Sequence, residues 1–294
     1  MISVWLRVIR IRFLLASVIA VSVALVIYWN QFNSLDFFSV VLTYAGVVSL
    51  HASVDLLNDY WDFRRGIDAA TKRTKMSGGT GVLPEGLLKP KSVYIAGIAF
   101  LILGGIIGTY FVMTNGIIIA IILAFAIFSI YFYSTKIVDS GLAEFFVALK
   151  GALIVIGAYF IQANQLTLES LLAGIVVGTL SSLVLFVASF PDYDADKSKG
   201  RKTLVIVTGK KNASVIYWVF PAITLGITIF GVLWNQFPNS VLISILPIPL
   251  VILAGLDLRK NYLKTELLFP TMSKTLLYSR LTGALLVIGF LIGM

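Results

Sequence analysis

Long apolar stretches alternate with shorter polar segments along almost the whole chain of 294 residues. A helix needs about 20 apolar residues to cross about 30 Å of hydrocarbon. Nine stretches reach or approach that length, at 12–30, 37–57, 92–113, 116–134, 141–161, 168–190, 213–234, 240–257 and 278–294. The pattern therefore predicts an all-α, polytopic membrane protein with nine transmembrane helices. Pro221, Pro247 and Pro249 are expected to kink the seventh and eighth helices.

The composition agrees with a membrane protein and excludes several kinds of site. Hydrophobic residues make up 59% of the chain and charged residues 13%, whereas soluble proteins average about 25% charged residues. The absence of cysteine excludes disulfides, thiolate nucleophiles and cysteine-bound metals. The first apolar stretch follows Arg7, Arg10 and Arg12 as a signal peptide would. No clear cleavage site follows it, so we expect it to be a retained span.

The basic residues indicate how the helices are oriented. With the N-terminus in the cytoplasm, every lysine and arginine except Lys150 falls in or beside a cytoplasmic segment. Basic residues concentrate in cytoplasmic loops, so the net charge of +9 reflects topology, and we expect no nucleic-acid partner. The polar loops near 58–91 and 191–212 are then both cytoplasmic, and the C-terminus is external. The expected location is the cell membrane.

Both long loops open with clustered aspartates. The first cluster holds Asp55, Asn58, Asp59 and Asp62 in one helical stripe, with Asp68 following; the second holds Asp192, Asp194 and Asp196. On a helix Asp192 and Asp196 share a face, and Asp194 points away to solvent. Carboxylates at the ends of apolar helices repel one another and resist desolvation. Because Mg²⁺ binds through a few carboxylates, waters and substrate phosphates, two facing clusters predict Mg²⁺ ions that clamp a diphosphate.

Basic and glycine-rich segments follow the clusters. The candidates for neutralising phosphate oxygens are Lys72, Arg73, Lys75, Lys136, Lys197, Arg201 and Lys202. The stretch from Ser77 to Gly86 is rich in glycine, which brings backbone N–H groups close to phosphate, but it is not a Walker loop. We expect it to fold into a cap over the site. A single aspartate cluster is most simply a solvated helix end, so the prediction depends on there being two.

Several polar residues lie within the predicted spans. His51 is expected to contact Asp55 one turn later, with Asp55 as an outer neighbour of the metal ligands. Lys150 and Glu144 are intramembrane charges, which are candidates for function, and they are equally able to pair with each other or with another helix. Tyr133 and Lys136 end the fourth span on the active face.

At Asn58-Asp59-x-x-Asp62 and Asp192-x-x-x-Asp196 the chain resembles the UbiA superfamily of intramembrane aromatic prenyltransferases. The run from Gly200 to Leu204 is similar to the Gly-Lys-Arg-Thr-Leu signature of that family. The resemblance covers the whole layout and implies a helical bundle around a central cavity, capped on the cytoplasmic side and open laterally to lipid. It also implies Mg²⁺, a polyprenyl diphosphate donor, and metal ligands at Asn58, Asp62, Asp192 and Asp196.

The motif details resemble one branch of the family more closely. Many members have an acidic residue four positions after Asp62, where this chain has Gly66, and Asp68 comes two residues later. This variant, followed by the glycine-rich stretch, resembles the branch that prenylates 1,4-dihydroxy-2-naphthoate in menaquinone biosynthesis. Ala188 and Ser189 precede the second motif where that branch often has asparagines. Asp59 and Asp68 are candidates for accepting the proton that the acceptor ring loses. Asp62, Asp192 and Asp196 are the other candidate catalytic residues.

The expected reaction is the Mg²⁺-dependent transfer of a prenyl group from an isoprenyl diphosphate to an aromatic quinone precursor, through an allylic cation. We expect one membrane domain, 1–294, with two related halves near 1–135 and 136–294, because four spans separate the two loops. A 4-hydroxybenzoate or a lipid alcohol such as geranylgeranylglyceryl phosphate is an alternative acceptor. A membrane ion transporter is the alternative of another class, although its acidic residues belong at the midplane. The Asp-Gly-x-x-Ala-Arg core of CDP-alcohol phosphotransferases is absent.

Overall fold

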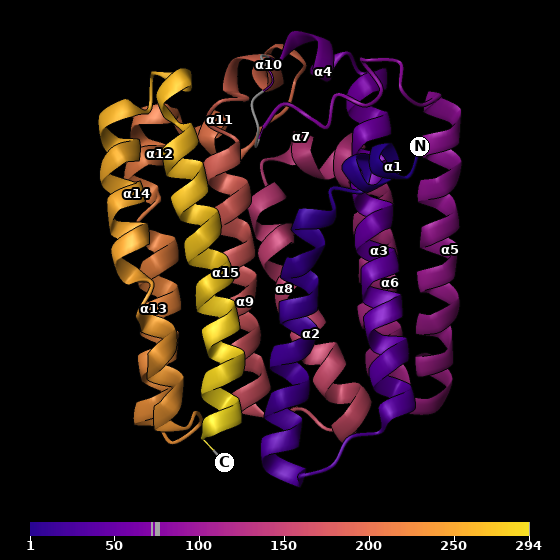
Figure 1. Ribbon diagram of the computed structural model, residues 1–294, viewed down its shortest axis with the longest axis vertical. Helices are drawn as coiled ribbons and strands as arrows, with labels where there is room; N and C mark the ends of the chain where they lie inside the picture. Colours follow the sequence, from indigo (N-terminus) through magenta and orange to yellow (C-terminus); the bar gives the residue numbers. More distant parts are fainter. Residues whose placement is uncertain (72, 74–76, 294) are drawn as a thin grey trace.

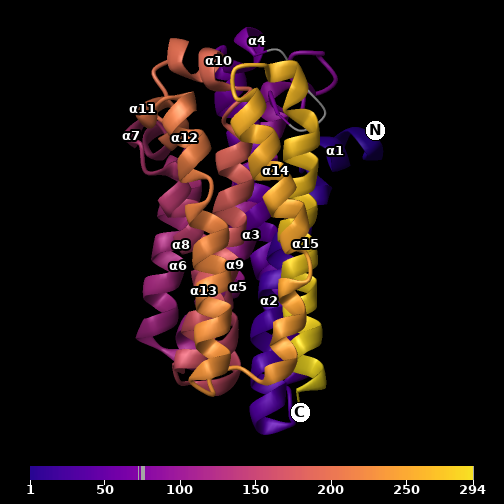
Figure 2. The same ribbon diagram turned by 90° about the vertical axis from the view of Figure 1, so that its left-hand side faces the viewer.

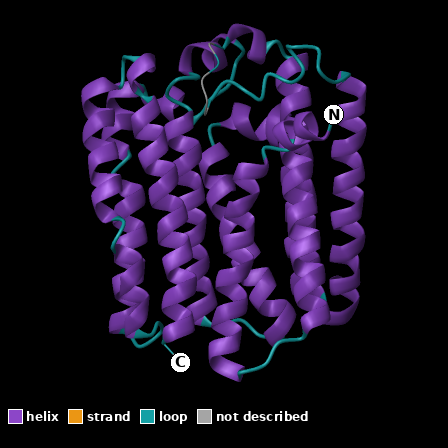
Figure 3. Ribbon diagram, in the orientation of Figure 1, coloured by secondary structure: helices purple, strands orange, loops and turns teal. Residues whose placement is uncertain are grey.

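Helices form all the regular structure that the computed structural model describes, which is residues 1–71, 73 and 77–293 (Figure 3). In this part of the chain, nine helical segments are long and apolar enough to cross a membrane. They are α2 (Ile11–Phe32), α3 (Phe37–Arg64), α5 (Pro90–Asn115), α6 (Ile117–Phe132) continued by η1 (Tyr133–Ile137) and α7 (Val138–Ser140), α8 (Ala143–Ala163), α9 (Leu168–Ala188), α12 (Lys210–Ile216) with α13 (Val219–Leu233), η2 (Asn239–Ile245) with α14 (Ile248–Asn261), and α15 (Phe269–Ile292). The predicted all-α polytopic fold is confirmed.

Short helices and loops cover one end of the bundle (Figure 1). They are α1 (Ile2–Val8), α4 (Ile67–Ala70), α10 (Tyr193–Ser198), α11 (Leu204–Thr208) and η3 (Thr265–Leu267). The N-terminus lies near this capped end and the C-terminus at the opposite end, which the view turned by 90° also shows (Figure 2). Both aspartate-rich loops therefore share a side with the N-terminus, as the charge pattern predicts. The direction in which the chain crosses its membrane stays a prediction.

The spans differ in how much of their surface other helices cover. In the most apolar stretch of α9, 67% of the residues are buried. The corresponding share for α5 is 17%. α9 packs against α8, α13 and α15, whereas α5 packs mainly against α3. The main core cluster comes chiefly from α2, α8, α9, α14 and α15, with partly buried side chains of α13 packed against it. The outward side chains of α5 and α6 are apolar and suit a lipid solvent, in which each helix satisfies its own backbone hydrogen bonds.

Local signals set the ends of several spans. Asp36 caps α3 by accepting hydrogen bonds from the backbone N–H groups of Phe38 and Ser39. Thr167 and Ser170 form a reciprocal capping box at the start of α9. Asn33 ends α2 in the left-handed conformation, which asparagine tolerates better than most residues. These polar ends are the points at which the chain leaves the apolar layer.

Glycines bring α8 and α9 unusually close together. A Cβ atom on Gly151 of α8 would lie 2.7 Å from the Cα atom of Gly178 on α9. A Cβ atom on Gly174, one turn earlier in α9, would lie 3.0 Å from the carbonyl oxygen of Ala152. Small residues spaced four apart let membrane helices pack backbone to backbone. The contact fixes the rotation of α8, and with it the direction of the neighbouring Lys150.

The observed spans depart most from the predicted boundaries at two places. α3 runs on to Arg64, beyond the predicted end at 57, so the first aspartate cluster lies on a helix. α15 begins at Phe269, well before the predicted start at 278. Its first turns carry Lys274, which pairs with Asp257 of α14 at 2.5 Å, and buried threonines. Polar side chains at these positions lower the hydropathy of the helix without ending it. The seventh and eighth spans are each broken near their prolines, as expected.

Candidate active site

A cavity of about 1090 Å³ lies among the spans and under the cap. Its wall comes from α2, α3, α6, α8, α9 and α15, together with the glycine-rich segment. At the capped end the wall is polar and includes Asn58, Asp62, Asp192, Asp196 and Arg201. Further down it is mostly apolar, with side chains such as Val47, Ile130, Phe146, Ile154 and Leu180. The predicted central cavity is present, and it combines an ionic end with an apolar chamber.

The first motif presents Asn58 and Asp62, one helical turn apart on α3. The Asn58 Nδ2 donates a hydrogen bond to Asp62 Oδ2 at 3.2 Å, and the Asn58 Oδ1 accepts one from Ser134 Oγ at 2.8 Å. Ser134 belongs to η1, a π-helical turn, a feature that often marks functional sites. Arg65 donates to the Ser134 carbonyl at 2.5 Å and pairs with Asp139 at 2.9 Å. Both motif side chains are therefore held in position from a neighbouring helix.

The second motif follows α9 directly. Asp192 is the residue before α10 and Asp196 lies one turn later, and both side chains line the cavity. The Asp194 side chain points away, is 85% exposed and lies 3.5 Å from Lys210, as its spacing predicts. Burial raises the pKa of Asp192 to about 7, and the neighbouring Asp196 carboxylate acts in the same direction. A cation at this position would favour the charged form of both groups.

Arg201 joins the two motifs across the cavity. Its Nη1 lies 3.0 Å from Asp196 Oδ1, and its Nη2 binds Asp62 Oδ1. The carboxylate side chains of Asp62 and Asp196 are only 8% and 6% exposed. Two carboxylates from segments far apart in the sequence thus share one cation, and this shows that the motifs face each other.

The oxygen-rich character of this end fits Mg²⁺. Within the described residues, no group of three or more His, Cys, Asp or Glu side chains forms a cage for a metal. However, Mg²⁺ usually binds proteins through one or two carboxylates and takes its other ligands from water and phosphate. Asp192 Oδ1 is buried and accepts no hydrogen bond, so one ligand oxygen has no partner within the protein. The four residues that the family resemblance assigns as ligands all line the cavity.

Asp59 and Asp68 point elsewhere. Asp59 is fully buried, and its carboxylate accepts hydrogen bonds from Thr80 Oγ1 at 2.9 Å and Thr80 N at 3.2 Å. Arg10 lies 3.7 Å from the same carboxylate. Asp68 packs beneath Gly79, and burial raises its pKa to about 7. Neither residue lines the cavity. Their contacts hold the glycine-rich segment, and their catalytic assignment stays a prediction.

Replacing Thr80 by valine is expected to lower the free energy of unfolding by about 1–3 kcal/mol, because a buried Asp59 oxygen loses its donor while the shape is kept. The measurement is SDS-induced unfolding of the detergent-solubilised protein. Thr109→Val is the matched control, since Thr109 is exposed and bonds only within α5. Equal stability of the two variants would show that the Asp59–Thr80 contact does not hold the loop.

The basic candidates divide into two groups. Arg73 and Arg201 line the cavity. Arg73 also pairs with Glu85 at 2.5 Å, and Glu85 binds Arg7 of α1 at 2.7 Å, so the N-terminal helix is tied to the cap. The exposed side chains that do not line the cavity are Lys136, Lys197 and Lys202. Lys72 and Lys75 fall outside the described residues. The phosphate-binding assignments of these five lysines stay predictions.

Arg10 is a cavity residue that the sequence did not single out. It lies between α1 and α2 in the left-handed conformation, with φ of 53°, and its side chain lines the cavity. Its Nε is buried and has no hydrogen-bond partner. In the sequence it is one of three arginines before an apolar stretch, which topology alone explains. No spacing signal marks it, and because Arg7 and Arg12 line the same cavity, only the fold identifies these arginines as cavity residues.

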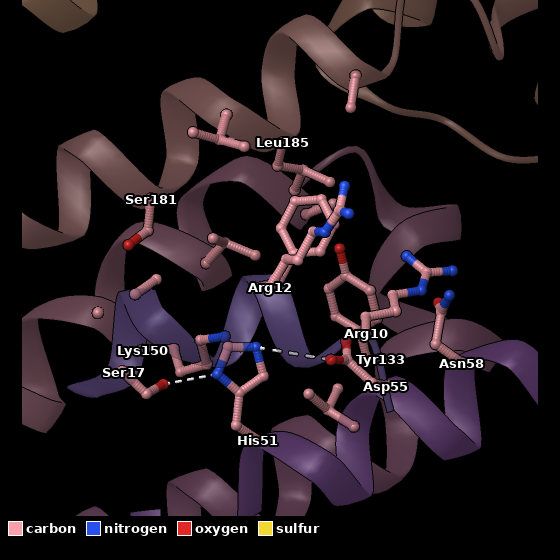
Figure 4. A pocket seen from close by; sticks show the side chains of 18 of the residues that line it. Arg10, Arg12, Ser17, His51, Asp55, Asn58, Tyr133, Lys150, Ser181 and Leu185 are labelled. Carbon is pink, nitrogen blue, oxygen red and sulfur yellow. Dashed lines mark hydrogen bonds and ion pairs between the residues drawn. The ribbon is translucent and has the colours of Figure 1, made fainter. Parts of the chain in front are cut away.

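A second polar group lies deeper, on the membrane-spanning part of the wall (Figure 4). His51 Nε2 lies 3.9 Å from Asp55 Oδ2, the expected contact, and His51 Nδ1 lies 2.6 Å from Ser17 Oγ. Lys150 lines the same part of the cavity. Glu144, the other intramembrane charge, is buried and accepts hydrogen bonds from the Leu204 backbone N–H at 3.1 and 3.2 Å. Glu144 therefore caps α11 and is not paired with Lys150.

Comparison with known proteins gives consistent matches. Residues 17–292 match the UbiA prenyltransferase family. A 1,4-dihydroxy-2-naphthoate octaprenyltransferase of Bacillus subtilis (strain 168) is 27% identical over 168 residues, which cover 56% of this chain and 53% of that protein. The alignment thus spans about half the length of this relative.

Two solved structures share the fold over nearly the whole chain. One is a UbiA homologue from Archaeoglobus fulgidus bound to GPP and Mg²⁺, with a TM-score of 0.63 and 16% identity, covering 96% of this chain and 99% of that one. The other concerns a digeranylgeranylglyceryl phosphate synthase, with a TM-score of 0.62 and 18% identity, covering 99% and 98%. At these identities the likeness establishes the architecture.

Proposed function

Because the chain belongs to the UbiA prenyltransferase family, we propose that it transfers a prenyl group from an isoprenyl diphosphate to an aromatic quinone precursor. The observation that carries the proposal is the facing of two aspartate motifs, from α3 and α10, at the polar end of an apolar cavity. A prenyl diphosphate has the same division into a charged head and a hydrocarbon tail. An ion path across a membrane would place its acidic groups near the midplane.

The polar end is the proposed site for the diphosphate head. Asn58, Asp62, Asp192 and Asp196 would hold Mg²⁺, which neutralises phosphate charge and makes diphosphate a better leaving group. Arg10, Arg73 and Arg201 line the same end and would bind phosphate oxygens that carboxylates repel. Gly78 supplies a backbone N–H directed at Asp192, 3.4 Å away, so the glycine-rich segment closes the site from above.

The proposed chemistry begins with cleavage of the C–O bond of the donor. Diphosphate leaves with the bonding electrons, and the remaining allylic cation lies against the aromatic faces of Tyr133 and Phe146, which line the cavity. A ring carbon of the acceptor then forms the new C–C bond and loses its proton. Asp59 and Asp68, proposed from the sequence as acceptors of that proton, lie off the cavity wall, whereas Asp55 lies on it.

The aromatic acceptor is proposed from two observations. The Bacillus subtilis relative acts on a dihydroxynaphthoate by its name, and the Gly66 and Asp68 variant of the first motif resembles that branch. A role in menaquinone biosynthesis follows as part of the proposal. The likeness to the glyceryl phosphate synthase is one of fold, so a lipid alcohol remains the alternative acceptor. The nine spans make the protein a multi-pass membrane protein, and we propose that the cap faces the cytoplasm.

Product formation tests the proposal directly. Purified protein is incubated with geranylgeranyl diphosphate and each of 1,4-dihydroxy-2-naphthoate, 4-hydroxybenzoate and geranylgeranylglyceryl phosphate, with Mg²⁺ or with EDTA. Mass spectrometry is expected to find a prenylated aromatic product with Mg²⁺ and none with EDTA. A product with the glyceryl phosphate alone would replace the aromatic acceptor by a lipid alcohol. Failure to bind or cleave the donor, together with ion transport in liposomes, would overturn the enzyme assignment.

A further inference from the structure

A polar cluster lies in the membrane-spanning part of the cavity, below the aspartate motifs. It consists of Ser17 on α2, His51 and Asp55 on α3, and Lys150 on α8, and Figure 4 shows these side chains around one part of the wall. The first three are linked in a row by the contacts of His51. The mechanism proposed above uses none of the four for binding the diphosphate.

Lys150 differs from the other members because its ammonium group has no direct partner. Within the described residues it makes no hydrogen bond and no ion pair within 4 Å, although it lies near enough to Asp55 and His51 for longer-range interaction. A lysine charge in the middle of a membrane helix is costly and marks a candidate functional group. The tight packing of α8 on α9 keeps this residue facing the cavity. The Lys150 ammonium group therefore offers a positive charge and three N–H donors to the cavity.

The depth of Lys150 separates it from the diphosphate end. Glu144 marks the top of α8, because its carboxylate binds the backbone of Leu204 in the cap. Lys150 lies six residues deeper, about 9 Å along the helix axis. Phe146 lies one turn above Lys150 and also lines the cavity. An aromatic ring bound at the level of Phe146 would lie between Lys150 and the polar end proposed for the diphosphate.

We propose that Lys150 binds the carboxylate of the aromatic acceptor and so helps to select and orient that acceptor. The inference rests on the proposed function and specifies a residue that recognises its acceptor. The ring lies against Phe146 and Tyr133, and its carboxylate extends down to the Lys150 ammonium. Asp55 lies beside His51 on α3 and also lines the cavity, and its carboxylate repels an acid that enters with its ring reversed. A neutral ring of the same shape has no carboxylate to pair with the Lys150 ammonium group, so it is expected to bind more weakly.

Equilibrium binding tests this inference without any turnover. The probes are 1-hydroxy-2-naphthoate and 1-naphthol, which share a ring and differ in the carboxylate, measured by equilibrium dialysis against protein in nanodiscs. Wild-type protein is expected to bind the acid more tightly. Lys150→Met is expected to weaken binding of the acid about 10- to 100-fold, the worth of a hydrogen-bonded charge, and to leave 1-naphthol unchanged. Binding of inorganic diphosphate with Mg²⁺ is expected to stay unchanged as well.

Lys211→Met is the matched control, because Lys211 is an exposed lysine of α12 away from the cavity. Equal loss of acid and naphthol in Lys150→Met would make Lys150 only a structural counter-ion of Asp55. Weaker binding of diphosphate with the acid unaffected would assign the lysine to the donor. Should the variant fail to fold, equal affinity of the wild type for the two probes would still overturn the inference. Acid binding without any prenylated product would instead contradict the proposed function.

Discussion

Replacing Asp192 by alanine is expected to abolish prenyl transfer, a loss of about 1,000-fold or more, while the protein accumulates normally. Asp192 lines the polar end of the cavity, and its Oδ1 is buried without a hydrogen-bond donor. Burial raises the pKa of this carboxyl group to about 7, because its charged form is poorly solvated there. Removing the side chain relieves a buried charge and breaks only the long hydrogen bond of 3.4 Å from the Gly78 N–H, so the loss falls on catalysis and not on folding.

Activity is measured as product formation at saturating concentrations of Mg²⁺ and donor. The melting temperature in detergent is measured separately as a control for folding. Asp194→Ala is the control, because Asp194 belongs to the same motif but its side chain is 85% exposed. It is expected to keep wild-type activity. Asp62→Ala is expected to lose activity equally, and also some stability, because Arg201 and Asn58 both bind this carboxylate. Appreciable turnover by Asp192→Ala would remove this residue from the catalytic site.

Replacing Arg201 by leucine is expected to lower the free energy of unfolding by about 3–5 kcal/mol, because the substitution leaves two buried carboxylates without their shared cation. Asp62 and Asp196 then repel each other across the cavity. A divalent cation at the same place would restore much of the attraction. The melting temperature of this variant is therefore expected to rise with added Mg²⁺ more steeply than that of the wild type.

The comparison needs thermal unfolding of both proteins in detergent, with a series of Mg²⁺ concentrations and with Ca²⁺ and EDTA. Lys211→Leu is the control for the loss of a basic residue, since this lysine is exposed and outside the cavity. It is expected to unfold as the wild type does in every condition. If Mg²⁺ has no greater effect on Arg201→Leu than on the wild type, the facing carboxylates do not form a cation site.

The sequence predicted the membrane-spanning layout because the signal is local. Each span is a run of apolar residues whose length the bilayer sets, and polar caps such as Asp36 and Thr167 mark where runs begin. It missed the first turns of α15, where Lys274 and buried threonines lower the average hydropathy and Lys274 pairs with Asp257 of α14. The division into two related halves stays a prediction.

The sequence also predicted which residues would meet at the capped end. Asn58, Asp62, Asp192 and Asp196 line one cavity, as two motifs on one face of a membrane require. Helical spacing could not tell Asp59 from Asp62, because both lie on the same stripe of α3. Only the fold decides that Asp59 bonds to Thr80 in the loop while Asp62 faces Arg201.

The sequence shows which loops carry basic residues, but it does not show which of those residues reach the cavity. The distribution of lysines and arginines follows the membrane and can be read from the sequence, because the bilayer acts on every loop in the same way. Whether a given cation reaches the cavity depends on how helices distant in the sequence pack. Arg10 and Arg201 line the cavity, whereas Lys197 and Lys202 remain exposed. The sequence thus determined the spans and the motifs, and tertiary packing alone decided which charged side chains share the site.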